Sequence, residues 1–343
     1  MSKVKVCIIG AGRAGMIHAR NVAWRIKDAE LVAVCDPNAS ALNAARQEFG
    51  NARLCLDYPE ALADKSTDAV VIVTPTFLHR EMAVAAAQRG KHIFLEKPMA
   101  VTVEECDAIN AAVARAGVIL QLGFMRRFDD GFMRAKEILS TGEMGRVMII
   151  KSTGRGPGGP GPWMWDLRKS NGIIAEVNSH DIDSLLWMTD DRIVRLYAEA
   201  HNFKMPEVME KFPDFYDNVV VSLRLASGAM GMIDGTCPAH YGYDARMEIL
   251  CEKGLLMVGS VQQQGCIKVT VEGRVEGQAV KTWRTLFKDA YLAEMEHFVQ
   301  CVRDGAAPRV NGTDGKNAVE AVLAINRSVK SGQVITFPEE GAK

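Results

Sequence analysis

Short, uninterrupted apolar runs alternate with helix-like segments over the first 123 residues, and this alternation limits the possible folds more than any other feature. The runs are VKVCII, LVAVC, AVVIV, HIFL and VILQL. Strands without polar alternation are typical of a parallel sheet covered by helices on both faces. Helices are expected between them, for example over residues 79–88 and 103–116, the second after the capping box Thr102-x-x-Glu105. Residues 1–123 are therefore predicted to form a doubly wound α/β domain with a parallel sheet.

From about residue 145 the pattern changes to an alternation of apolar and polar residues. The segments VVVSLRL, RMEILC and IKVTV have this period of two, which indicates an antiparallel sheet with one face on helices and one face free. We therefore expect residues 124–343 to form an α+β domain with a large, mostly antiparallel open sheet that binds substrate. A free sheet face is often covered by another subunit, so we expect a homodimer or homotetramer through this C-terminal sheet.

The overall composition is that of a globular protein with no strong charge. The chain has 343 residues, enough for two domains, and a net charge of −1, which gives no reason to expect nucleic acid or a membrane surface as partner. No apolar run is long enough to cross a bilayer, and the N-terminus does not have the pattern of a signal peptide. The eight cysteines are scattered without a C-x-x-C pair, which favours buried thiols and a cytoplasmic location.

A glycine loop, GAGRAG at residues 10–15, directly follows the first apolar run and opens a helix expected over residues 13–26. In this context G-x-G-x-x-G is the fingerprint of a Rossmann dinucleotide-binding domain. Its glycines allow a tight turn, close approach of a pyrophosphate, and, at Gly15, close packing of helix on strand. The pyrophosphate would then rest on the helix N-terminus. The residues expected there are Gly10, Gly12, Arg13 and Ala14.

The second apolar run ends in Asp36, at about the 20-residue distance from the loop at which such domains place a ribose-binding acid. A carboxylate there accepts hydrogen bonds from the ribose hydroxyls and repels a 2′-phosphate, so NAD is expected in preference to NADP. Arg13 and Arg46 could serve a 2′-phosphate, and an ordinary turn at Asp36 is the alternative interpretation.

Two further strands end in polar residues. The carboxyl ends of parallel strands form the ligand crevice of such a sheet. AVVIV ends in Thr74-Pro75-Thr76, and HIFL ends in Glu96-Lys97-Pro98, whose proline restricts the backbone of the lysine. The residues expected to border the cofactor are Thr74, Thr76, His79, Glu96 and Lys97.

A second polar group lies in the later segment EVNSHDIDSLLW. Read as one helix, it places acids, a histidine and a tryptophan along one stripe, at Glu176, His180, Asp183 and Trp187. Such a stripe can also be a solvated helix face. A metal site would need a second histidine at ligand spacing, so no metal is expected.

Together these groups make up the parts of an alcohol dehydrogenase. Hydride leaves a C–H bond as the attached hydroxyl loses its proton, and the imidazole of His180 is suited to accept that proton. The ammonium of Lys97 can stabilise the developing alkoxide, and Glu176 can orient the imidazole. A short-chain dehydrogenase is excluded because no tyrosine has a lysine four residues on, and a zinc alcohol dehydrogenase because clustered Cys and His ligands are missing.

At several motifs the chain resembles the Gfo/Idh/MocA family, which includes the glucose–fructose oxidoreductases and the inositol dehydrogenases. These motifs are GAGRAG, Glu96-Lys97-Pro98, QLGFMRRF at 121–128, the E-x-x-x-H-D-I-D segment at 176–183, and the tail that starts AEMEHFVQCVRDG. The resemblance implies a two-domain NAD(P)-dependent enzyme that acts on sugars, cyclitols or related polyols, usually as a dimer or tetramer.

The resemblance also implies roles for single residues. Lys97 corresponds to the E-K-P lysine and His180 to the base, while Glu176 stands where inositol dehydrogenases commonly have Asp. Gln121 would then adjoin the cofactor, and Arg127 and Asp183 match positions that touch substrate in relatives. The Gly/Pro-rich segment 154–162 leads into Trp163 and is expected to act as a substrate lid. The full set expected at the substrate is Lys97, Arg127, Trp163, Glu176, Asn178, His180, Asp183 and Tyr243, with Tyr241 as a further candidate.

The leading hypothesis is NAD-dependent oxidation of a secondary alcohol on a cyclitol or sugar, with inositol as first choice. Two alternatives remain open: reduction of a keto-sugar at the same site, and a sensor that binds dinucleotide without turnover. The sequence leaves open the isomer, the carbon that is oxidised, the physiological direction and the choice between dimer and tetramer.

Overall fold

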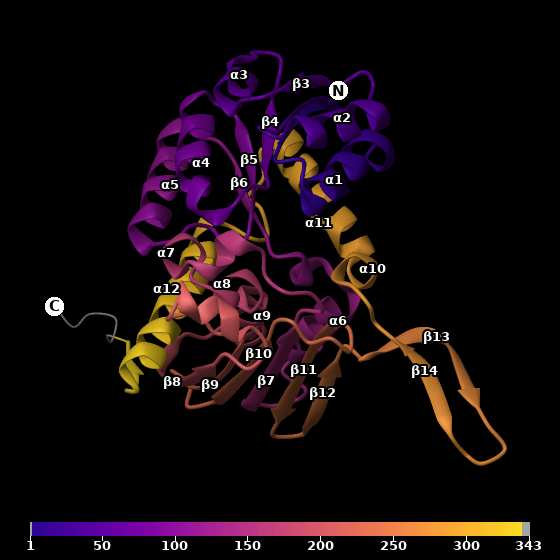
Figure 1. The fold of residues 1–343 in the computed structure, drawn as a ribbon, viewed down its shortest axis with the longest axis vertical. Helices are drawn as coiled ribbons and strands as arrows, with labels where there is room; N and C mark the ends of the chain where they lie inside the picture. The colour runs from indigo at the N-terminus through magenta and orange to yellow at the C-terminus, as the bar shows by residue number, and fades with distance from the viewer. Residues whose placement is uncertain (1, 338–343) are drawn as a thin grey trace. The chain divides into compact units, whose positions relative to one another are not determined.

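A computed structural model describes residues 2–337, with the side chains of residues 264–266 left out of the description (Figure 1). The chain forms two compact units. Unit 1 comprises Met1–Phe128 and Asp289–Val319, and unit 2 comprises Asp129–Lys288 and Glu320–Lys343. The first boundary follows Phe128, a few residues beyond the expected one, and a late segment returns to unit 1.

Unit 1 contains a six-stranded parallel sheet with the order β3-β2-β1-β4-β5-β6. This is the Rossmann strand order, which reverses between β1 and β4 and leaves a ligand crevice at the carboxyl ends of the strands. The predicted doubly wound domain is thus confirmed. Its strands are β1 Val4–Ile9, β2 Ala29–Cys35, β3 Arg53–Cys55, β4 Ala69–Ile72, β5 His92–Glu96 and β6 Leu120–Gly123.

The helices of unit 1 follow local signals in the sequence. α4 and α5 have the predicted bounds, and the helix expected over residues 13–26 changes to a π-helix after Arg20. The helices in this part of the chain are α1 Arg13–Arg20, η1 Asn21–Arg25, α2 Ala39–Glu48, α3 Tyr58–Ala63, η2 Thr76–Leu78, α4 His79–Gln88, α5 Val103–Ala116 and η3 Met125–Phe128.

Helix α11 (Lys288–Asp304) brings the late segment back to this sheet, as its orange colour among the indigo and magenta elements shows (Figure 1). Met295, Phe298 and Val299 on α11 belong to the same buried core cluster as Phe94 on β5 and Val34 on β2. The core of unit 1 is therefore completed by residues from the far end of the chain.

Unit 2 contains a seven-stranded sheet with the order β12-β11-β7-β10-β9-β8-β15. β7 and β10 pair in parallel and the other neighbours are antiparallel, which confirms the expected α+β architecture. The strands are β7 Val147–Arg155, β8 Ile193–His201, β9 Asn218–Leu225, β10 Met230–Thr236, β11 Asp244–Cys251, β12 Gly254–Val258 and β15 Ile335–Thr336.

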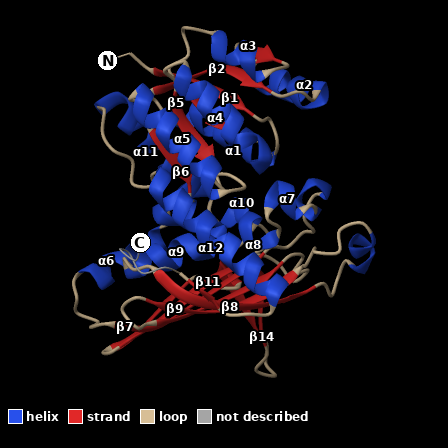
Figure 2. Cartoon of the chain, turned by 90° about the vertical axis from the view of Figure 1, so that its left-hand side faces the viewer, coloured by secondary structure: helices blue, strands red, loops and turns tan. Residues whose placement is uncertain are grey.

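One face of this sheet is covered and the other is exposed (Figure 2). Helix α9 packs on β7 and β10, and residues alternate between buried and exposed along β9 and β10. The remaining helices assigned to this part of the chain are α6 Asp130–Ser140, η4 Pro162–Trp165, α7 Leu167–Ser170, α8 Ile173–Glu176, α9 Ser179–Thr189, η5 Pro206–Glu210, α10 Trp283–Leu286 and α12 Gly312–Ser331, the last of which continues from unit 1 into unit 2.

A two-stranded hairpin of β13 (Gln262–Val269) and β14 (Val275–Ala279) extends from unit 2 (Figure 1). The predicted strand IKVTV lies in this hairpin rather than in the seven-stranded sheet. Over residues 2–337, no helix combines the length and the apolar character needed to span a membrane.

Candidate active site

The glycine loop has the geometry of a pyrophosphate cradle. Gly10 has φ of +104°, and a Cβ there would lie 2.3 Å from the Val73 carbonyl oxygen. A Cβ on Gly15 would lie 1.8 Å from the Gly10 oxygen, so helix α1 packs directly on the loop. At Gly12, by contrast, an added Cβ would meet no described atom within 4 Å. Gly12 is the N-cap of α1 and no side chain caps it, which leaves the helix N-terminus open for an anion.

Asp36, directly after β2, joins this loop. Its Oδ2 accepts the Ala11 N–H at 2.7 Å, and its Oδ1 accepts the Asn38 N–H at 2.8 Å. The carboxylate thus lies against the glycine loop, where the dinucleotide fold places the adenosine ribose. The loop, the uncapped helix and the acid fit NAD.

His79 links the ends of two strands of unit 1. Its Nδ1 lies 2.8 Å from the Pro98 oxygen and its Nε2 lies 2.9 Å from the Thr74 oxygen, and the ring is 1% exposed. Both partners are acceptors, which favours a ring with two N–H donors, whereas burial lowers the pKa of His79 and favours the neutral ring. In either form the ring connects Thr74, after β4, to the residue that follows Lys97. Thr76, in η2, is buried beside it.

The acid of the E-K-P motif is directed back into unit 1. Glu96 Oε1 lies 2.9 Å from His18 Nε2, and Glu96 Oε2 accepts the Lys97 N–H at 3.1 Å. A Cβ on Gly123 would lie 2.9 Å from this carboxylate, so the glycine leaves room for it. Glu96 is 6% exposed, and Lys97 is partly exposed at the carboxyl end of the sheet.

Residues 121–128 form hydrogen bonds with residues 289–319, the late segment that belongs to unit 1. Gln121 is fully buried and its Nε2 donates to the Glu294 carbonyl oxygen at 2.8 Å. Arg127 Nη2 donates to Asp314 Oδ1 at 3.0 Å, and the Arg127 carbonyl accepts from Arg309 Nη1 at 2.9 Å. The roles of Gln121 at the cofactor and of Arg127 at the substrate stay predictions.

The predicted single helix through Glu176 and His180 is wrong. Glu176 ends the short helix α8, and His180 belongs to α9, which starts at Ser179. The break occurs at Asn178, a fully buried residue whose Nδ2 donates to the Gly154 oxygen at 3.0 Å and to Asp181 Oδ2 at 2.8 Å. Glu176 therefore does not lie one helical turn from His180 along the same helix.

His180 and Asp183 are both at the buried start of α9. They are 6% and 2% exposed. Three residues apart on one helix, they share a face, as predicted.

Asp181 positions this helix, a role that the sequence did not indicate. It is fully buried, and its Oδ1 accepts the Ser152 hydroxyl of β7 at 2.6 Å. A Cβ on Gly154 would lie 1.9 Å from Asp181 Oδ2, and a Cβ on Gly235 would lie 2.2 Å from Asn178 Oδ1. Glycines on two paired strands therefore allow the start of α9 to dock on the sheet. These strand glycines are the signal in the sequence, but Gly154 also belongs to the Gly/Pro-rich segment that is expected to be a substrate lid, which obscures its role in the strand.

The Gly/Pro-rich segment is hydrogen-bonded to unit 2 at several points, and its role as a substrate lid stays a prediction. Gly154 belongs to β7, the Ala239 N–H donates to the Gly156 oxygen at 2.6 Å, and the Cys237 thiol donates to the Gly158 oxygen at 2.9 Å. Trp163 is partly buried in η4 directly after it. Tyr243 is 7% exposed and its ring packs edge-on against Phe287. The substrate contacts of Trp163 and Tyr243 stay predictions.

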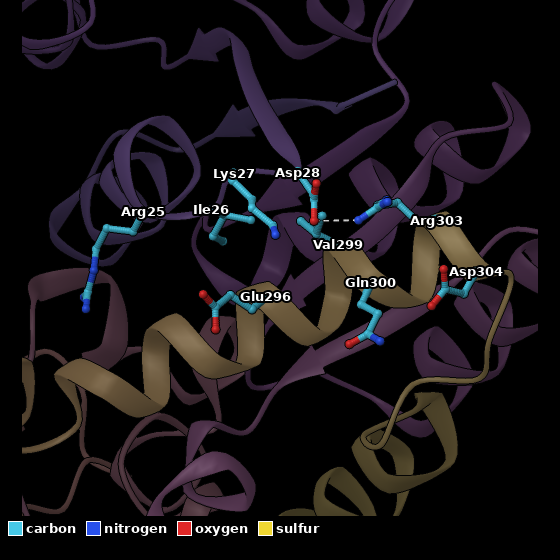
Figure 3. Close-up of a pocket in the computed structure, with 9 residues that line it drawn as sticks. All are labelled: Arg25, Ile26, Lys27, Asp28, Glu296, Val299, Gln300, Arg303 and Asp304. Atoms are coloured by element: carbon cyan, nitrogen blue, oxygen red, sulfur yellow. Dashed lines mark ion pairs between the residues drawn. The ribbon is translucent and has the colours of Figure 1, made fainter. Parts of the chain in front are cut away.

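A pocket of about 480 Å³ in unit 1 is distinct from these residues (Figure 3). It lies between the segment that precedes β2 and helix α11, where Arg303 Nη1 pairs with Asp28 Oδ2 at 2.6 Å. Asp28 comes just before β2, so the pocket is at the amino end of that strand, opposite to the glycine loop. None of the predicted site residues line it; its lining is Arg25, Ile26, Lys27, Asp28, Glu296, Val299, Gln300, Arg303 and Asp304.

Two family models match most of the chain. Residues 4–124 match an oxidoreductase family with an NAD-binding Rossmann fold, and residues 132–257 match the GFO/IDH/MocA C-terminal domain.

Similar proteins extend over the full length. A scyllo-inositol 2-dehydrogenase (NAD(+)) of Bacillus subtilis is 32% identical, over 97% of this chain and 96% of its own. A myo-inositol 2-dehydrogenase of Thermotoga maritima is 31% identical, over 98% and 99%. The crystal structure of a scyllo-inositol dehydrogenase from Lactobacillus casei with bound NAD(H) and scyllo-inositol superposes with a TM-score of 0.89 at 25% identity, over 98% and 99%.

Proposed function

This chain belongs to the Gfo/Idh/MocA family of NAD-dependent oxidoreductases acting on CH–OH groups, and from this premise we propose that it oxidises a ring hydroxyl of a cyclitol, with an inositol as the first candidate. The observation that carries this assignment is the full-length likeness to inositol dehydrogenases, one of them solved with NAD(H) and scyllo-inositol bound. Residues 1–128 supply the cofactor half, and unit 2 is proposed to supply most of the substrate contacts.

Gly10, Gly12 and the start of α1 would hold the pyrophosphate of NAD, and Asp36 would accept the adenosine ribose hydroxyls. The open space at Gly12 and the absence of a side-chain cap on α1 within the described residues support this placement. The negative charge of Asp36 disfavours a 2′-phosphate, which supports NAD over NADP.

Lys97 and His180 are proposed to act on one hydroxyl. Bound NAD would supply the acceptor for the hydride that leaves the carbinol carbon. The His180 imidazole accepts the hydroxyl proton, and the Lys97 ammonium stabilises the oxygen as its charge develops. Support comes from the Lys97 main chain, which is held by Glu96, and from the docked start of α9, which fixes the backbone of His180.

Glu176 is proposed as the acid that assists His180, now from the end of α8. Arg127, Trp163, Asp183 and Tyr243 are proposed to contact the ring hydroxyls of the substrate. Asn178 is fully buried, with its amide bonded to β7 and to Asp181, so its proposed contribution is through the position of α9.

The exposed face of the unit 2 sheet supports a homo-oligomer. It carries apolar side chains that are 36% to 75% exposed, namely Val220, Met230, Met232, Leu250, Leu255 and Met257. Apolar patches on a sheet are typical of subunit interfaces. We propose that a second copy of the chain covers this face.

The decisive experiment is an absorbance screen at the nicotinamide wavelength with NAD and with NADP, against inositol isomers, aldoses and 1,5-anhydro sugars. NADH formation with one or more inositols is expected. NADH formation with aldoses alone would overturn the cyclitol assignment, and tight NAD binding without turnover on any polyol would favour a dinucleotide sensor.

A further inference from the structure

Three titratable side chains lie close together inside unit 1, and one of them belongs to Glu96, the residue before Lys97. They come from three elements: His18 from α1, Glu96 from the end of β5 and Glu294 from α11. One nitrogen or oxygen atom from each lies within 4.8 Å of those of the other two. His18 and Glu294 are fully buried. No step of the proposed reaction uses His18 or Glu294.

Glu294 is the unusual member of this group. Neither of its carboxylate oxygens has a hydrogen-bond partner among the described residues. An ionised carboxylate buried without a partner is strongly unfavourable, so its charge must be neutralised by a proton or by a cation.

The other two members already satisfy one another. Glu96 Oε1 lies 2.9 Å from His18 Nε2, and Glu96 Oε2 accepts the Lys97 N–H. If Nε2 of His18 carries a proton, the bond to the Glu96 carboxylate is charge-assisted. Nδ1 of His18 has no partner among the described residues, which favours a neutral ring without a proton there. A ring that donates from Nε2 has no lone pair on that atom for a metal, so a proton on Glu294 remains as the neutralising group.

We propose that Glu294 is protonated and neutral in the folded protein beside the Glu96 carboxylate, so that His18, Glu96 and Glu294 form a buried group with one neutral acid that fixes the main chain of Lys97. The link to catalysis at Lys97 rests on the proposed function, whereas the protonation of Glu294 does not.

The surroundings of Glu294 agree with this assignment. Burial and the charge of Glu96 raise the pKa of Glu294 well above its ordinary value. The titratable groups described close to it are His18 from α1 and Glu96 from β5. Tyr291, also on α11, packs its ring 5.6 Å from that of His18. β6 contributes the uncharged Gln121, which holds α11 at the Glu294 carbonyl.

Protonation is tested with the isosteric variant Glu294→Gln and the control Glu296→Gln, an exposed acid on the same helix. Infrared spectra of the wild type should contain the C=O stretch of a protonated carboxylic acid, which E294Q loses and E296Q keeps. A wild-type spectrum without this band, or a stoichiometric metal ion that E294Q loses, would overturn the protonated state.

The pH dependence of stability gives a second readout. A glutamate in the unfolded chain releases its proton near pH 4.3, whereas folded Glu294 keeps it, so the wild type loses stability as the pH rises. E294Q has no proton to release at this position. The urea midpoint of E294Q should therefore increase relative to that of the wild type between pH 5 and pH 8, and E296Q should follow the wild type. Parallel curves for E294Q and the wild type would contradict the proposal.

The positioning role is tested at His18, which does not contact Lys97 in any described hydrogen bond. His18→Ala removes the donor to Glu96, while His18→Gln can restore a side-chain N–H. Loss of a charge-assisted bond corresponds to about a tenfold effect, so kcat of H18A should fall about tenfold with the NADH Kd unchanged, and H18Q should recover most of it. Equal losses in both variants, or a parallel loss of NADH binding, would overturn positioning. An inactive wild type would instead defeat the proposed function, while the infrared and stability tests would still apply.

Discussion

The carboxylate of Asp36 and the main chain of Ala11 are joined by a 2.7 Å hydrogen bond, so the acid after β2 holds the glycine loop directly. Asp36, which the sequence predicts to bind the adenosine ribose, therefore also forms a hydrogen bond within the cofactor-binding domain, to the glycine loop. Removing its charge should affect both the loop and the choice of dinucleotide.

Asp36→Ala should raise KM for NAD about tenfold, as expected for loss of a charge-assisted hydrogen bond, and should raise the ratio of activity with NADP to activity with NAD. Steady-state kinetics with both cofactors measure this. Glu30→Ala, an exposed acid on the same strand, is the control and should leave both values unchanged. An unaltered preference in D36A would show that Asp36 does not select the cofactor.

Alanine at Gly12 and alanine at Gly15 should affect different properties of the protein. Gly12→Ala adds a Cβ into open space, so thermal stability should stay close to that of the wild type while NAD binding weakens. Gly15→Ala places a Cβ 1.8 Å from the Gly10 oxygen, so stability should fall by about 1–3 kcal/mol. Calorimetry and NADH titration separate the two results. Normal NAD affinity in G12A would contradict the pyrophosphate cradle.

Substitution of the proposed catalytic pair should abolish turnover and spare cofactor binding. Lys97→Met and His180→Ala should each lower kcat by about 10²- to 10⁴-fold, the usual contribution of a general acid–base or charge-stabilising group. NADH affinity should persist because neither side chain is needed for the pyrophosphate. His201→Ala, an exposed histidine on β8, is the matched control. Full activity in H180A would remove His180 as the base.

The docking of α9 should depend on a strand glycine. Gly235→Ala places a Cβ 2.2 Å from Asn178 Oδ1, so it should displace Asn178, lower the free energy of unfolding by about 1–3 kcal/mol and reduce kcat. Gly277→Ala, a strand glycine whose added Cβ would have its closest atom at 3.7 Å, should be tolerated. Wild-type stability and kcat in G235A would show that this contact does not hold α9.

A charge on the exposed sheet face should disrupt assembly. Met257 is 75% exposed, and Met257→Asp should shift the protein to a smaller species in size-exclusion chromatography with light scattering. Leu56→Asp, at a 58% exposed residue of unit 1, is the control for an apolar-to-acidic change elsewhere. A monomeric wild type, or an M257D variant with unchanged mass, would rule out this face as the interface.

Features with local causes could be predicted from the sequence. The bounds of α5 follow from its N-terminal cap and from Gly117 at φ of +62°. At the cap, Thr102 Oγ1 accepts the Glu105 N–H at 3.2 Å and Glu105 Oε2 accepts the Val101 N–H at 3.0 Å. The parallel sheet followed from apolar runs that are buried on both faces.

Features with distant causes could not be predicted. The break between α8 and α9 depends on Asn178 reaching Gly154 on another strand, which helical spacing cannot reveal. The His18–Glu96–Glu294 group unites residues from the beginning and the end of the chain. The place of Glu96 at the end of its strand is visible in the sequence, whereas no local pattern marks His18 or Glu294.

The return of α11 to unit 1 has a consequence for biosynthesis. Met295, Phe298 and Val299 fill the core beside Phe94, so a nascent chain that ends near residue 128 lacks part of the hydrophobic interior of its own first domain. During synthesis, the nucleotide-binding half cannot complete its core until almost the whole polypeptide has emerged from the ribosome. A gene fragment that encodes this half alone should yield an aggregation-prone product unless residues 289–319 are supplied with it.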